Sequence, residues 1–229
     1  MTNPPDLAAF AQLRNAWQTV RPGLYPTALM DGERLTAMRQ VQLRIATCGG
    51  WTQGPSTLMD VLGVTRNEVM NCRVVRWLLD PLGRHRIGTH LLTSLARELH
   101  LDVPDIQQAR VEAEVSRDRS RADIVVTGPG GAWTWVLEAK VDAAEGDEQG
   151  RRLEEDWPEA DQLVFLTIRG ERLPWTAIEP ARWRPLSWAW VADTTLRLLS
   201  DVDAPTDVRA SEARHAAAAW AHTAGRNLA

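Results

Sequence analysis

The segment from Arg121 to Lys140 holds the residues whose types and spacing can do chemistry. Asp123 lies in a short apolar run, and Glu138 and Lys140 end a second run that follows a Gly/Pro-rich turn. Lys140 is the only lysine among 26 Lys and Arg residues. An ammonium and a guanidinium differ in shape, in hydration and in their ability to act as a point charge. Lys140 is therefore a candidate for chemistry that arginine cannot perform, with chance as the alternative.

Period-2 alternation predicts that the two runs form a β-hairpin. Glu138 and Lys140 then share a face, and Asp123 comes close to opposite Leu137, next to Glu138. An Asp and a Glu directed at one point form an oxygen site of the kind that binds Mg²⁺ or Mn²⁺, and the backbone carbonyl of Ala139 offers a further ligand. Such an ion beside a lysine suits hydrolysis of a phosphodiester. A surface ion pair between Glu138 and Lys140, of little energetic importance, is the alternative.

Glu68 is a third carboxylate with two possible roles. Thr65 and Glu68 have the spacing of a capping box, in which Thr65 caps a helix and Glu68 reaches back to its backbone. Glu68 also shares a helix face with Cys72, Val75 and Leu79. A carboxylate at the head of an inward stripe needs a partner or a metal to compensate its charge. Both roles remain open from the sequence.

Apolar periodicity and turn residues predict the elements that position these groups. Helices are expected over 6–20, 29–46, 65–79, 89–99, 148–157, 187–200 and 211–224, and strands over 110–116, 123–127, 133–140 and 162–167.

Composition limits the classes of protein that the chain can be. Its 229 residues are enough for one core with an added subdomain, and the net charge of −4 argues against a broad basic surface. The N-terminus lacks the pattern of a signal peptide, no apolar run is long enough to span a bilayer, and Cys48 and Cys72 suit reduced thiols, so a cytoplasmic location without membrane contact is expected. Most of the 11 tryptophans are expected to be structural, although exposed aromatic rings can stack on bases.

From Thr65 to about Trp190 the chain resembles the PD-(D/E)XK nuclease superfamily, and more narrowly a bacterial branch of nuclease-like proteins. The residues that carry the resemblance follow in the expected order: Asn67-Glu68, Leu78-Leu79-Asp80-Pro81 with His85, Glu114, Arg121-Ala122-Asp123-Ile124, Glu138-Ala139-Lys140 and Gln149. Two positions depart from the usual pattern. Ala122 replaces a frequent proline, and Gly150 follows Gln149 where leucine is more common.

The resemblance implies a restriction-endonuclease-like α/β/α sandwich with a mixed central sheet. We place this core at 65–200, after an N-terminal helical extension (1–64) and before a linker and C-terminal helix (201–229). It also implies roles for the site residues. Asp123 and Glu138 would bind the metal, Lys140 would act on the base side or stabilise charge, Glu68 would act through the outer sphere of the metal, and Gln149 would steady Lys140 or a phosphate.

The implied function is a metal-dependent nuclease that uses Mg²⁺ or Mn²⁺ and acts on DNA rather than RNA. The roles of proteins in this family suggest defence against foreign DNA, and the chain would act as a homodimer or in a larger assembly. We expect nucleic-acid contacts from Arg73, Arg84, His85, Arg119 and Arg121, with solvated surface charge as the alternative for the arginines. The alternative function is a catalytically silent nuclease-like fold that serves as a nucleic-acid-binding or assembly module.

Overall fold

The computed structural model describes residues 28–47, 55–203 and 205–228. The chain separates into two compact units, Met1–Gly54 and Pro55–Ala229. The described part of the first unit is the helix α2 (Ala28–Thr47), which matches the predicted helix over 29–46. The predicted helix over 6–20 and Cys48 lie outside the described residues.

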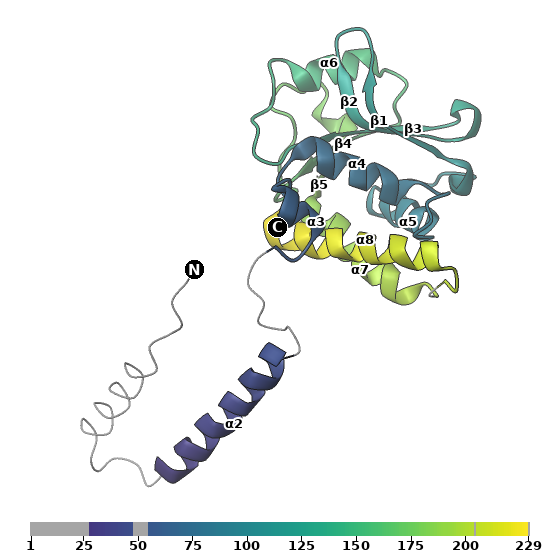
Figure 1. The fold of residues 1–229 in the computed structure, drawn as a ribbon. Helices are drawn as coiled ribbons and strands as arrows, with labels where there is room; N and C mark the ends of the chain where they lie inside the picture. Colours follow the sequence, from purple (N-terminus) through teal and green to yellow (C-terminus); the bar gives the residue numbers. More distant parts are fainter. Residues whose placement is uncertain (1–27, 48–54, 204, 229) are drawn as a thin grey trace. The chain divides into compact units, whose positions relative to one another are not determined.

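A five-stranded mixed sheet forms the centre of the second unit (Figure 1). Its strands lie in chain order, β1 (Arg110–Ser116), β2 (Arg121–Thr127), β3 (Thr134–Ala139), β4 (Gln162–Thr167) and β5 (Trp183–Ser187). The first three strands run antiparallel as a meander, whereas β3, β4 and β5 run parallel. Parallel neighbours need a crossover connection, and α6 supplies the one between β3 and β4. The predicted α/β class with a mixed sheet is confirmed.

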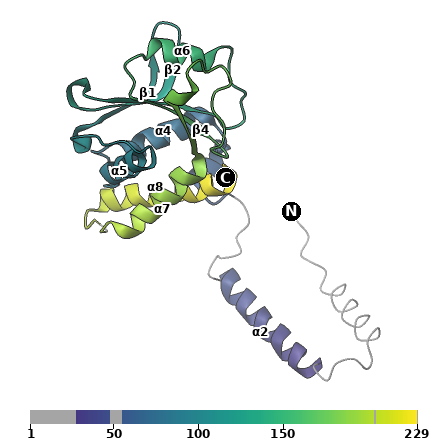
Figure 2. The same cartoon turned by 180° about the vertical axis from the view of Figure 1, so that it is seen from behind.

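Helices cover both faces of the sheet, as the front and back views show (Figures 1 and 2). The helices of this unit are α3 (Leu58–Leu62), α4 (Glu68–Leu79), α5 (Gly88–Glu98), α6 (Gln149–Asp156), α7 (Trp188–Asp201) and α8 (Val208–Asn227). The larger core cluster joins one sheet face to α4, α5, α7 and α8. The smaller cluster joins the other face to α6 through Leu153 and Trp157.

One strand and one α-helix of this unit were not predicted from the sequence. The strand β5 contains Pro185, which lacks a backbone N–H and so weakens the pattern of a strand. Proline is tolerated there because β5 is an edge strand. The helix α3 has five residues and none of them is buried, so it leaves no apolar periodicity to detect.

Within the described residues, no helix is both long enough and apolar enough to cross a membrane.

Candidate active site

Asp123 and Glu138 come together because of the register between β2 and β3. The last pair of that ladder is Ile124 with Leu137, which places Asp123 level with Glu138. The sequence had placed Asp123 opposite Leu137, so that prediction is wrong by one residue. In place of a further ladder bond, the backbone N–H of Ala139 donates to Asp123 Oδ2 at 2.8 Å. The Asp123 side chain thus takes the role of a backbone acceptor at the end of the ladder.

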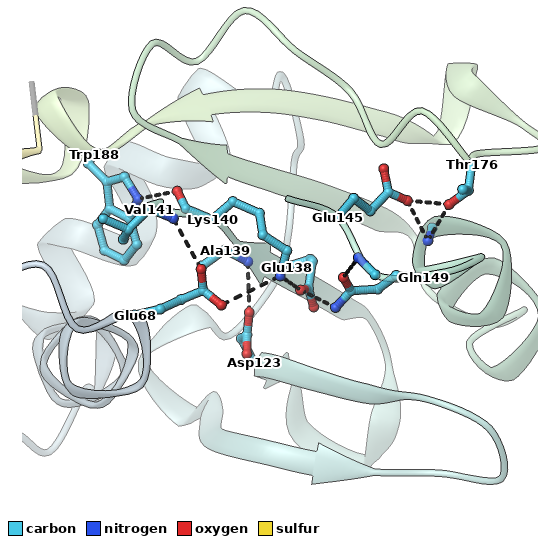
Figure 3. A network of polar contacts seen from close by, with 12 residues as sticks. Glu68, Asp123, Glu138, Ala139, Lys140, Val141, Glu145, Gln149, Thr176 and Trp188 are labelled. Atoms are coloured by element: carbon cyan, nitrogen blue, oxygen red, sulfur yellow. Dashed lines mark hydrogen bonds and ion pairs between the residues drawn. The ribbon is translucent and has the colours of Figure 1, made fainter. Parts of the chain in front are cut away.

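Lys140 follows the last residue of β3, and its side chain lies between two carboxylates (Figure 3). Its Nζ is 2.6 Å from Glu138 Oε1 and 3.5 Å from Glu68 Oε1. Gln149, the first residue of α6, donates from Nε2 to the same Glu138 Oε1. Two donors from different elements therefore fix one oxygen of Glu138.

Glu68 reaches the site because it is the first residue of α4. The N-cap is Asn67, whose side chain accepts from the N–H of Met70. The predicted capping box of Thr65 and Glu68 is therefore wrong, because the helix begins later than the spacing suggested. Glu68 Oε2 instead accepts from the N–H of Val141 at 3.1 Å. Cys72, one turn further along the helix, is buried, and the Glu68 side chain on the same face reaches Lys140 and the backbone of Val141.

The alternation of side chains between the two sheet faces is interrupted in β1 and β2 next to Asp123. In β2, Ile124 and Val126 pack in the larger core cluster, but Ala122, which regular alternation would place with them, packs in the smaller one. The neighbouring strand changes in the same way, with Val111 in the larger cluster and Val115 against the smaller one. Val111 and Val115 therefore lie on different faces, although regular alternation in the predicted strand over 110–116 would place them on the same face. The switch coincides with Glu114, whose φ of 54° is left-handed.

The site concentrates negative charge away from water. Burial and, to a smaller extent, the nearby Asp123 raise the pKa of Glu138 to about 8, against the opposing effect of Lys140. Burial also raises the pKa of Asp123, against the opposing effects of the Ala139 N–H and Lys140. For Lys140 burial acts to lower the pKa, but Glu138, Glu68 and Asp123 together outweigh it and the pKa is raised. One ammonium thus faces three carboxylates, so the site favours a further positive charge or a bound proton.

The donor set fits a hard divalent cation. Glu138 Oε2 is buried and has no hydrogen-bond partner in the described part of the chain. The N–H of Ala139 points toward Asp123, and in a strand the N–H and C=O of one residue point to the same neighbour, so the Ala139 carbonyl is directed there too. Carboxylate and carbonyl oxygens are the ligands that Mg²⁺ and Mn²⁺ prefer. The described residues contain no metal-binding group of three or more His, Cys, Asp or Glu side chains, so a cation here would rest on two carboxylates and backbone or water oxygens.

A pocket of about 630 Å³ opens over these groups. Arg119, Arg121 and Arg152 line it. Arg119 lies 2.6 Å from Glu155, whereas neither Arg121 nor Arg152 forms an ion pair with any described residue. Arg152 was not predicted as a site residue. Its signal was its place three residues after Gln149, since that spacing puts both side chains on one face of a helix.

The other residues predicted to contact nucleic acid lie differently. Arg73 lies 3.3 Å from Glu114, outside the pocket lining. Arg84 follows α4 at the end remote from Glu68, about 18 Å along a helix of 12 residues. His85 is fully buried, with Nε2 bonded to the Trp77 carbonyl and Nδ1 accepting from the N–H of Ile87. The structure therefore does not support a nucleic-acid contact for His85, because its ring is used to close the turn between α4 and α5.

No protein-family model, curated protein or solved structure matches the chain.

Proposed function

We propose that the unit Pro55–Ala229 is a metal-dependent nuclease of the PD-(D/E)XK type that hydrolyses phosphodiester bonds of nucleic acid, with DNA as its first substrate. One observation carries the proposal. Asp123, Glu138 and Lys140, which come from two strands and the residue after them, meet Glu68 and Gln149 at the N-termini of two helices in one pocket.

The ligands of the metal are assigned from the geometry of the oxygens. Asp123, Glu138 and the carbonyl of Ala139 would hold Mg²⁺ or Mn²⁺, which when bound neutralises charge on the phosphate and polarises its phosphorus–oxygen bonds. Lys140 and Gln149 both donate to Glu138 Oε1, and so they hold the carboxylate while Oε2 stays without a protein partner.

The remaining groups act on the phosphate and on the lysine. As water attacks phosphorus and the bond to the leaving oxygen breaks, negative charge grows on the phosphoryl oxygens. The Lys140 ammonium stabilises this charge in a site with little competing water. Glu68 orients Lys140 from the other side, since one of its oxygens is fixed by the N–H of Val141. Arg121 and Arg152 would bind the flanking phosphates.

Cleavage by matched variants tests the proposal. Supercoiled plasmid and a single-stranded oligonucleotide are incubated with purified protein and Mg²⁺ or Mn²⁺. Asp123→Asn keeps an acceptor for the Ala139 N–H but loses the charge, and Lys140→Met keeps the alkyl chain but loses the ammonium. We expect cleavage by the wild type and a loss of at least about 100-fold in both variants, on the scale of removing one charge-stabilising group. Arg197→Ala, an exposed change on α7, serves as the control and should keep full activity.

Cleavage that survives both substitutions would overturn the proposed site. Absence of cleavage together with Mn²⁺ binding that Asp123→Asn abolishes would favour the alternative of a silent nuclease-like module with an intact site.

A further inference from the structure

A second pocket adjoins the candidate active site on the other side of Lys140. It measures about 670 Å³, within the range of pockets that hold small ligands. Lys140 lines both pockets, so a molecule in the second one lies next to the reacting groups. Phe165, Leu173 and Trp175 form much of its apolar lining. We call it the Trp175 pocket.

The charges of the Trp175 pocket are unbalanced in favour of anions. Its two carboxylates are occupied, since Asp142 accepts from Arg66 Nε at 2.8 Å and Glu145 accepts from the N–H of Trp175 at 2.7 Å. The two arginines of its lining, Arg169 and Arg172, are exposed and form no ion pair with any described residue. Arg169 and Arg172 therefore add two guanidinium groups, without ion-pair partners in the described part of the chain, to a lining in which the two carboxylates and Lys140 already have partners.

Trp175 is held so that its ring meets solvent. Its side chain is 74% exposed, the most exposed tryptophan in the described part of the chain. Its backbone is nevertheless fixed, because Glu145 accepts from the N–H of Trp175. Glu145 also accepts from the hydroxyl of the next residue, Thr176 (Figure 3). Gly150 allows this segment to pack closely on α6, since a Cβ at that position would lie 2.7 Å from Pro174. This contact explains why glycine follows Gln149.

An exposed indole on a fixed backbone beside free arginines has the chemistry of a stacking site. The ring face attracts the flat face of a nucleobase, and the guanidinium groups attract the phosphates of the same strand. In a duplex both faces of each internal base are covered by its neighbours, so such a ring can accept only a base that is unstacked.

We propose that the Trp175 pocket binds an unpaired nucleobase, with the adjoining phosphates on Arg169 and Arg172. The substrate is then a single strand, or a duplex end or junction with an unpaired base, and the scissile phosphate lies one pocket away at Lys140. This inference rests on the proposed function in placing the scissile phosphate, but base binding is measurable without cleavage.

The test is binding of labelled oligonucleotides to the full chain in EDTA, followed by fluorescence anisotropy. The probes are a 20-nucleotide oligo(dT), an abasic strand of the same length and a 20-base-pair duplex, with lengths of about 20 chosen to exceed one binding site. We expect the wild type to bind oligo(dT) at least about tenfold more tightly than the duplex. Trp175→Ala should weaken oligo(dT) binding about tenfold and leave abasic binding unchanged, because only stacking is lost. Trp175→Phe should retain most of the affinity.

Leu82→Ala and Arg197→Ala are the controls, and two arginine variants test the phosphate contacts. Leu82→Ala removes a side chain that is 89% exposed on the turn after α4, and it should change nothing. Arg169→Ala and Arg172→Ala should each lower the slope of log affinity against log salt by about 0.7, the value for one phosphate of a single strand. Arg197→Ala should leave the slope unchanged.

Equal oligo(dT) affinity of Trp175→Ala and the wild type would overturn the inference, and so would equal losses on the oligo(dT) and abasic strands. These outcomes are distinct from failure of the proposed function. A protein that never cleaves but loses oligo(dT) binding on Trp175→Ala supports the base site, whereas one that cleaves and is indifferent to Trp175→Ala keeps the nuclease and loses the base site.

Discussion

Glu114 lies opposite Asp123 between strands β1 and β2, at the point where both strands change the face on which their side chains alternate. The flanking pairs, Ala113 with Ile124 and Val115 with Ala122, fix this register. Glu114 has a φ of 54°, a left-handed conformation that costs a side-chain-bearing residue about 1–2 kcal/mol. Asp123 leaves the regular ladder at the same place, and its carboxylate accepts from the N–H of Ala139 instead.

Replacing Glu114 tests this relationship. The free energy of unfolding of Glu114→Gly should lie within about 1 kcal/mol of the wild-type value. Glycine adopts φ > 0 freely, and this gain offsets the loss of the exposed ion pair with Arg73. Glu114→Val should be less stable by about 2 kcal/mol, because a β-branched residue is strained there. Urea denaturation measures both values. Equal stability of the two variants would mean that the left-handed backbone is not present in solution.

Glu138→Gln should change how stability depends on pH. In the folded protein the pKa of Glu138 is raised from 4.5 to about 8, so between these pH values the folded state binds a proton that the unfolded state lacks. Its contribution to the free energy of unfolding is therefore present at low pH and declines as the pH rises through this window, by up to about 1.4 kcal/mol per unit. Glutamine keeps the Oε1 acceptor for Lys140 and Gln149 but does not titrate.

Melting curves of both proteins from pH 5 to 8.5 provide the measurement. The wild type should lose stability relative to Glu138→Gln as the pH rises, and the variant should be the more stable protein at the alkaline end. Curves that run parallel across this range would show that Glu138 is not shifted.

Cation binding should release a proton. Since Glu138 is largely protonated at pH 7 and a carboxylate must be ionised to bind a metal, Mn²⁺ has to displace its proton. We expect close to one proton released per ion at pH 7, declining toward zero above pH 9. Isothermal titration calorimetry in buffers of different ionisation enthalpy counts these protons. Binding without proton release at pH 7 would argue against Glu138 as a ligand.

Spacing within single elements predicted a large part of the fold and the site. Four strands were predicted from their apolar patterns. The meeting of Asp123, Glu138 and Lys140 follows from period-2 alternation in the two strands around one turn, because hairpin partners are close in sequence. The place of Gln149 followed from the family resemblance and from the predicted helix over 148–157, which in the structure begins at Gln149.

The features that could not be predicted from the sequence depend on contacts between distant segments. The left-handed turn at Glu114 is selected by packing on both faces of the sheet, and glutamate gives no local sign of it. The free ring of Trp175 is likewise set by Glu145, which lies 30 residues away and reads locally as one more acidic loop residue. The buried role of His85 depends on the carbonyl of Trp77, which a sequence pattern does not show.

The C-terminal helix α8 provides a further case, because a buried hydrogen bond links it to the segment that leads into α4. Trp220 Nε1 donates to Asn71 Oδ1 at 2.9 Å, and Asn71 Nδ2 in turn donates to the carbonyls of Thr65 and Asn67. These carbonyls belong to the turn that leads into α4, the helix that begins at Glu68. The helix α8 therefore supports the position of Glu68, although the two lie far apart in sequence.

Trp220→Phe should destabilise the protein by about 1–3 kcal/mol, because it leaves the buried Asn71 oxygen without a donor. Trp190→Phe is the matched control. Its indole donates to Glu98 at 3.1 Å in an exposed pair, so water can replace the lost bond and the cost should stay below about 0.5 kcal/mol. Urea denaturation of both variants gives the comparison. Amide hydrogen exchange at the start of α4 should be faster in Trp220→Phe alone, and equal exchange in the two variants would mean that α8 does not hold the turn before Glu68.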